Sequence, residues 1–177
     1  ELREKLVKYE EISDRIEYEI AAFLNGVSAG DISEATSMKI KAMYKIIGEL
    51  ESLGDSGEAI SRMLSRRNEH KKTFSAETID NINLILEKVD GAYEVMIANL
   101  TAAHEGTLSS IANAYSAEEQ INTLRNELRE AEIEALEDND KNYQTSVYYI
   151  DIINELEHMG DYMINISQSL ERAFVAK

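Results

Sequence analysis

The chain has 177 residues, with 34 acidic and 18 basic side chains and a formal net charge of −16 at pH 7. This charge argues against nucleic acid as a partner, because binding there depends on Lys and Arg neutralising phosphates. No apolar run is long enough to span a membrane. The absence of Pro and Cys, with only 8 Gly, favours an all-α protein in a reducing compartment.

Two helices are predicted in the first part of the chain. The first carries one apolar stripe at spacings of three and four: Leu2, Leu6, Tyr9, Ile12, Ile16, Ile20 and Phe23. Asn25-Gly26 is expected to end it, because glycine accepts the left-handed conformation that follows a helix. Asp31 and Glu34 predict a capping box for a second helix that runs to about Arg67.

Three more helices are predicted after it. Ser75 is the expected cap of a helix over 76–103, and the break at His104-Glu105-Gly106 precedes a helix over 107–136. A polar turn at 137–142 leads into the last helix, which continues to about Ala173. Its core stripe consists of Ile152, Leu156, Met159, Met163, Ile166 and Leu170.

The second and fifth helices contain an internal repeat. Residues 46–64 and 152–170 share ten identities in nineteen positions, and 10–20 matches 118–128 more weakly. We therefore predict two units, 1–72 with two helices and 73–177 with three. The helix missing from the first unit would precede Glu1. Because the chain starts in helical phase without Met, we expect it to be a fragment of a longer polypeptide.

Two carboxylate pairs recur inside the repeat, Glu51 with Asp55 and Glu157 with Asp161. Side chains four residues apart on a helix lie one turn from each other and can point at one object. Because like charges at that spacing repel, a proton, an Arg or Lys side chain, or a metal cation has to compensate them.

The facing helices offer further oxygen ligands for a hard cation. The candidates are Glu10 and Asp14 in the first copy and Glu118 and Asn122 in the second. Gly54 and Gly160 would let those helices approach closely. The first copy is expected to bind a metal more strongly, because all four of its positions carry carboxylates. The alternative is that all these groups are solvated acids at helix edges.

The peptides "ELESLGDSGEAISRML" and "ELEHMGDYMINISQSL" resemble the signature helices of the PhoU-like phosphate-uptake regulators. The resemblance covers nearly the whole chain and implies tandem antiparallel helical bundles with five long helices, the first bundle lacking its first helix. It also implies multinuclear iron or zinc clusters on the motif carboxylates, and regulation of phosphate transport without catalysis.

The wording of these motifs is most similar to the soluble C-terminal PhoU-like domain of bacterial sodium/phosphate cotransporters. That resemblance implies a location at the cytoplasmic face of the membrane. The expected partners are the transporter's membrane domain or other phosphate-transport components, and homo-oligomers are a further possibility.

Other features leave alternatives open. Glu155 and His158 have the Glu-x-x-His spacing of a di-iron bundle, but the companion motif is missing. A basic cluster at the end of the second helix suits the helix C-terminus and could also form a partner surface; it comprises Arg62, Arg66, Arg67, His70, Lys71 and Lys72. A structural helical oligomerisation module is the main alternative function.

Overall fold

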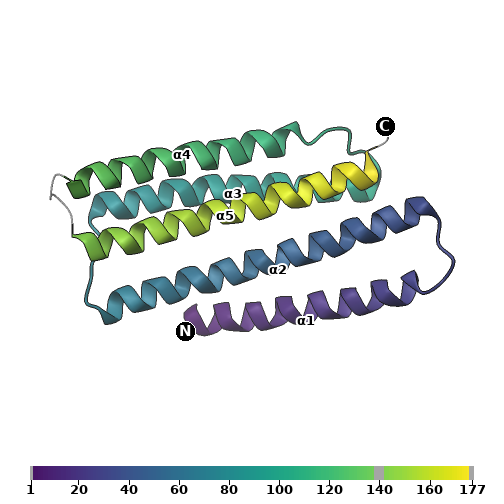
Figure 1. Cartoon of the computed structure of the whole chain (residues 1–177), viewed down its shortest axis with the longest axis horizontal. Coiled ribbons are helices and arrows are strands. Elements are labelled where there is room, and N and C mark those ends of the chain that lie inside the picture. The colour runs from purple at the N-terminus through teal and green to yellow at the C-terminus, as the bar shows by residue number, and fades with distance from the viewer. Residues whose placement is uncertain (1, 138–141, 176–177) are drawn as a thin grey trace.

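A computed structural model describes residues 2–137 and 142–175, and within these ranges every regular element is an α-helix. The helices are α1 (Leu2–Ser28), α2 (Glu34–Glu69), α3 (Ala76–Glu105), α4 (Ala112–Glu137) and α5 (Tyr143–Phe174). Consecutive helices run antiparallel (Figure 1). The predicted all-α, five-helix architecture is confirmed. Of the predicted turn at 137–142, residues 138–141 lie outside the described part of the chain.

Two of the predicted helix ends are confirmed. The Ser75 hydroxyl accepts a hydrogen bond from the Thr78 amide at 3.1 Å and so caps α3. Gly106 ends α3 in the left-handed conformation, with φ of 72°. A residue without a Cβ adopts this conformation at no steric cost.

Three other helix ends differ from the prediction. Helix α1 continues through Gly26 to Ser28, whose hydroxyl donates to the Leu24 carbonyl at 2.8 Å. The cap of α2 is Ser33 rather than Asp31, because the Ser33 hydroxyl accepts from the Thr36 amide. Helix α4 starts at Ala112 instead of near residue 107.

Helix α5 is the centre of the array and packs against α2, α3 and α4. Its predicted core stripe is confirmed, since all six side chains are buried or packed against the main core. The surrounding helices contribute other fully buried residues to the same core, among them Ile85 of α3 and Ile121 of α4.

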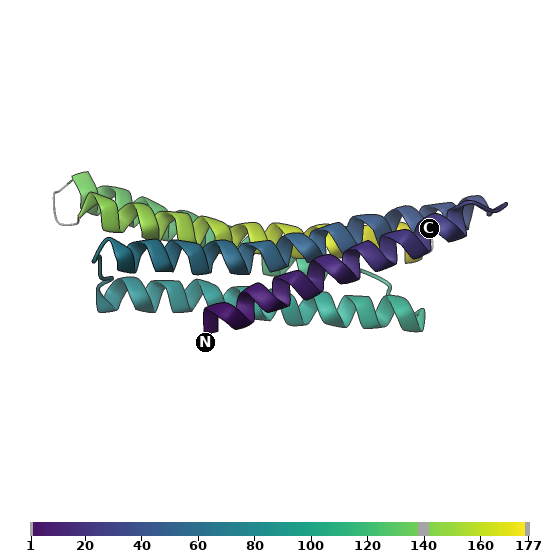
Figure 2. The ribbon, with the colours of Figure 1, turned by 90° about the horizontal axis from the view of Figure 1, so that it is seen from below.

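Helix α1 lies at the outer edge of the array and packs against α2 (Figures 1 and 2). An apolar stripe ordinarily faces a core, but here the stripe of α1 is largely exposed: Leu6, Tyr9, Ile12, Ile16, Ile20 and Phe23 are between 37% and 70% accessible. The side chain of Leu2 lies outside the described ones. The face that contacts α2 is instead formed by smaller or polar residues, with Leu24 as its buried apolar side chain.

The repeated helices α2 and α5 pack directly against each other with reciprocal contacts. Asn165 of α5 donates to Glu49 of α2 at 3.3 Å, and Ser56 of α2 donates to Glu155 of α5 at 2.5 Å. Glu49 and Glu155 are equivalent positions of the repeat. Each helix thus presents the same repeat glutamate to the other, as an approximate twofold axis between them would require. The division into units at residues 72 and 73 stays a prediction.

Candidate metal centre

Each copy of the Glu-x-x-x-Asp motif lies where a second helix crosses its glycine. A Cβ built on Gly54 would lie 3.5 Å from the Ser13 Oγ of α1, and one built on Gly160 would lie 3.0 Å from the Ile121 Cδ1 of α4. The weak alignment of 10–20 with 118–128 makes Ser13 and Ile121 equivalent. The pair α1–α2 thus repeats as α4–α5, with the motif glycine at a close approach in both.

In the first copy, three predicted ligands converge. Carboxylate oxygens of Glu10, Asp14 and Asp55 all lie within 4.8 Å of one another. Glu10 is half-buried, whereas Asp14 and Asp55 are exposed. Oxygen ligands at this separation suit a hard divalent cation that enters from solvent.

Glu51, the remaining ligand predicted in this copy, is half-buried one turn before Asp55. Burial raises its pKa to about 7, and the hydrogen bond and charge of Asp55 and the charges of Glu17 and Asp14 add to this effect. Among the described residues, no Lys or Arg forms an ion pair with this carboxylate or with the three converging ones.

The pKa of Glu10 is raised as well, first by burial and then by the charges of Asp14, Glu58 and Asp55. Two carboxyl groups of one cluster therefore hold their protons more tightly than free glutamates do. The crowding of negative charge that helps to raise these pKa values would also favour a bound cation, which has to displace the protons.

In the second copy the motif carboxylates have a different environment. The Arg125 Nη2 of α4 lies 2.5 Å from the Glu157 Oε1, and both side chains are largely buried. Asn122 donates its amide to Glu118 on the same helix. Glu157, Glu118 and Asn122 of this copy are thus engaged with protein groups.

Asp161 and His158 complete the second copy. Burial raises the pKa of Asp161 and the charge of Glu157 raises it further, while His158 and Arg125 act in the opposite direction. The His158 Nε2 lies 3.8 Å from Glu157, and its Nδ1 lies 3.8 Å from Glu155. His158 is half-exposed and stays at the rim of the site.

Sequence reasoning did not single out Glu17 or Arg125. The two residues are equivalent in the alignment of 10–20 with 118–128, so the repeat carries opposite charges at one position. The sequence alone could have shown this difference in charge between the two copies. What the sequence could not show is that this position faces the motif carboxylates.

The basic cluster at the end of α2 is divided among several local contacts. Arg62 forms an ion pair with Glu58, and the Arg67 guanidinium lies 4.4 Å from the centre of the Phe74 ring. Arg66 and Arg67 occupy the last turn of α2, where they suit the helix dipole. Arg66 and Lys71 remain exposed, so the role of this surface as a partner surface stays a prediction.

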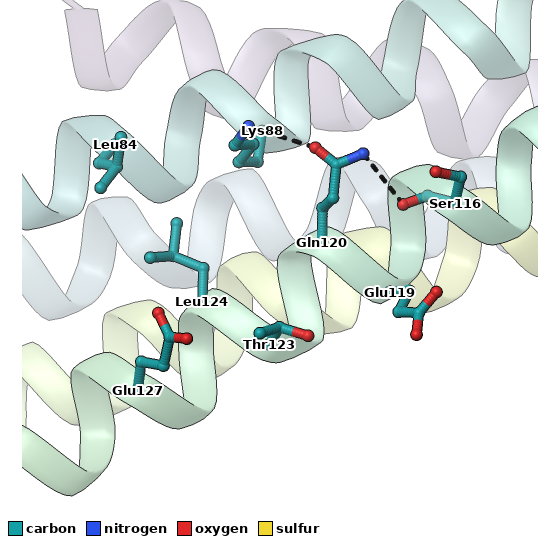
Figure 3. Close-up of a pocket in the computed structure, with 8 residues that line it drawn as sticks. All are labelled: Leu84, Lys88, Ser116, Glu119, Gln120, Thr123, Leu124 and Glu127. Atoms are coloured by element: carbon teal, nitrogen blue, oxygen red, sulfur yellow. Dashed lines mark hydrogen bonds between the residues drawn. The ribbon is translucent and has the colours of Figure 1, made fainter.

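An open groove between α3 and α4 lies apart from both motifs (Figure 3). Lys88 of α3 reaches across it to the Gln120 Oε1 of α4 at 3.2 Å, and Gln120 in turn donates to the Ser116 carbonyl. Since Lys88 and Gln120 bond to groups of the groove itself and no lining residue is a motif carboxylate, we assign it no role.

Over the described residues, no helix is long and apolar enough to cross a membrane. No curated protein and no solved structure matches the chain. Residues 83–170 match the family model described as "PhoU domain". The matched range begins within α3, ends one turn before the end of α5 and includes the second motif copy. This match supports a PhoU-like relationship for the α3–α5 part of the chain, and the all-helical fold is consistent with it.

Proposed function

We propose that the chain is a non-catalytic regulatory domain of a phosphate transport system, and that it binds a metal through its first motif copy. The observation that carries the proposal is the convergence of Glu10, Asp14 and Asp55 beside Glu51, in a chain whose residues 83–170 match the PhoU domain. The PhoU-like resemblance supplies the link to phosphate transport.

The donor set of the first copy fits a metal ion. All the groups are carboxylates, they come from two packed helices, and two of them, Asp14 and Asp55, are exposed to solvent. We propose iron or zinc as the metal, in a multinuclear cluster held by Glu10, Asp14, Glu51 and Asp55. The bound metal would supply positive charge that ties α1 to α2, so that metal occupancy controls how α1 is presented to a partner.

For the partner, we propose the membrane domain of a sodium/phosphate cotransporter, with this chain as its tail at the cytoplasmic face. The similarity of the motifs to those cotransporters supports this choice. The reading frame upstream of Glu1 tests it directly. Transmembrane segments there support the proposal, and a start codon next to Glu1 contradicts it.

Metal binding is tested by elemental analysis after dialysis against zinc or iron(II), on the parent chain and on two matched double variants. We expect Glu51→Gln with Asp55→Asn to lose the metal, because both substitutions remove charged oxygen ligands from the first copy. Equal and negligible metal in the parent chain and in this variant would overturn the proposed metal site. The matched variant, Glu157→Gln with Asp161→Asn, makes the same changes in the second copy.

Regulation is tested separately, by the uptake of labelled inorganic phosphate in bacteria that express the full-length parent. We expect the substitutions at Glu51 and Asp55 to change the uptake rate at equal protein level. Unchanged uptake would contradict a regulatory role for this copy.

The exposed face of α1 favours a second candidate function, a helical oligomerisation module whose partner is a second copy of the chain. Tyr9, Ile16 and Phe23 of this face are 64%, 52% and 70% exposed and recur every seven residues, which is the spacing with which helices pair in coiled coils. The tests are the mass in solution by light scattering and its change on Phe23→Ser. A monomer over a wide range of concentrations would exclude this candidate.

A further inference from the structure

The two motif copies face opposite charges at equivalent positions. Arg125 of α4 pairs with Glu157 in the second copy, whereas its counterpart on α1 is Glu17. The charge of Glu17 adds to those around Glu51 rather than offsetting them. One copy therefore contains its own cation, and the other contains one more anion.

Arg125 and Glu157 form an ion pair that is largely buried between α4 and α5. The two side chains are 23% and 10% exposed, and the Nη2 to Oε1 distance is 2.5 Å. A guanidinium does not lose its proton in a protein, so its charge is permanent. A metal ion at Glu157 would have to displace this guanidinium or bind next to it. In the second case the positive charges of the metal and of Arg125 would repel each other.

The rest of the second copy also fits a metal poorly. Asn122 replaces the carboxylate of Asp14 with a neutral amide, and that amide donates to Glu118. The copy has thereby lost one charged ligand and has a second one engaged. Metal affinity of oxygen sites falls as the charge of the ligand set falls.

We propose that Arg125 replaces the metal ion in the second copy, so that only the first copy, between α1 and α2, takes a metal. The claim that Arg125 replaces a metal in the second copy does not depend on the proposed function. The claim that the first copy takes a metal rests on it. The three-helix copy α3–α5 then keeps one electrostatic state regardless of metal supply, and only the α1–α2 contact responds to it.

Reciprocal exchange of the charges tests the proposal. Arg125→Glu with Asn122→Asp gives the second copy the ligand set of the first, and Glu17→Arg with Asp14→Asn does the reverse. Zinc per chain is measured by elemental analysis after dialysis. We expect the first variant to gain zinc over the parent and the second to lose what the parent holds.

Zinc retained by the parent but lost in Glu157→Gln with Asp161→Asn would overturn the inference, because it would place metal in the second copy. A failure of the Arg125→Glu, Asn122→Asp variant to gain zinc would also overturn it, provided that circular dichroism shows the variant folded.

A measurement in chelator separates this inference from the proposed function. Arg125→Met should lower the thermal midpoint by about 5 °C or more, because it leaves the buried Glu157 without its arginine partner. The exposed Arg129→Met on the same helix is the matched control and should change the midpoint little. Adding Glu157→Gln to Arg125→Met should restore part of the loss.

Additive effects of the Arg125 and Glu157 substitutions would overturn the role of Arg125 whether or not the first copy binds metal. Conversely, a parent chain that holds no zinc would overturn the proposed metal site. The coupling of Arg125 to Glu157 would still be measured, because the thermal midpoints are compared in chelator.

Discussion

Asn165 of α5 donates a hydrogen bond to Glu49 of α2, and Ser56 of α2 donates one to Glu155 of α5. Glu155 is the equivalent of Glu49 in the repeat. The first glutamate of each Glu-Leu-Glu segment thus holds the two repeated helices together. The second glutamate and the following aspartate face the outer helix, α1 or α4. Each repeat therefore separates a structural carboxylate from a pair of carboxylates that can serve a ligand.

The motif glycines differ in how much space surrounds them. We expect Gly160→Ala to destabilise the protein by about 1–3 kcal/mol, because its Cβ would lie 3.0 Å from the Cδ1 of the fully buried Ile121. Gly54→Ala is the matched control and should be neutral or stabilising by up to about 1 kcal/mol, because alanine favours the helix and the nearest atom is at 3.5 Å. Urea unfolding measures both.

Ile121→Val removes the crowding atom itself. In the parent chain, Ile121→Val should lower the free energy of unfolding by about 0.5–1.5 kcal/mol. In the Gly160→Ala variant, the same substitution should lower it by less. Simple additivity of the two substitutions would show that Gly160 is not limited by the contact with α4.

The metal-free protein should lose stability as pH rises through the range in which Glu51 titrates. The folded pKa of this carboxyl is about 7 against an ordinary value of 4.5, so the folded state binds more protons than the unfolded state between these values. The stabilisation that comes from the more tightly bound proton of Glu51 is fully present below pH 4.5 and is lost as pH rises through about 7. Thermal unfolding in chelator across this range is the measurement.

Glu51→Gln is the control for that titration, because glutamine fills the same space and carries no proton to lose. Its thermal midpoint should depend less on pH than that of the parent between pH 4.5 and 7. Identical pH profiles for the two proteins would contradict the assignment to Glu51.

The sequence predicted the five helices because long three–four periodicities and the capping residue Ser75 are local signals. It did not predict which face of α1 is covered. A stripe such as that around Ile16 shows which side of a helix is apolar, but its burial depends on a neighbour placed by the whole fold. The same limit applies to Arg125, whose reach to Glu157 depends on how closely α4 and α5 approach.

The cap of α2 is a local feature that the sequence placed two residues too early. Ser33→Ala should cost about 0.5–2 kcal/mol, because it removes the hydroxyl that accepts from the Thr36 amide. Asp31→Ala should stay within about 0.5 kcal/mol, since Asp31 is exposed and lies outside the helix. Equal costs for the two substitutions, measured by urea unfolding, would restore Asp31 as the cap.

The exposed face of α1 can be compared with its covered equivalent on α4. Ile16 and Leu124 occupy the same repeat position, but Ile16 is 52% exposed while Leu124 packs against the main core. Ile16→Ala should therefore cost no more than about 0.5 kcal/mol, and Leu124→Ala about 2 kcal/mol or more. Urea unfolding at low protein concentration measures the difference within one chain.

A large cost for Ile16→Ala that grows with protein concentration would mean that this face is covered by a second copy of the chain. In that case light scattering should show the parent as a dimer and the variant as a monomer. A large cost that is independent of concentration would instead contradict the exposed position of the α1 stripe, because only a neighbour within the same chain could then bury Ile16.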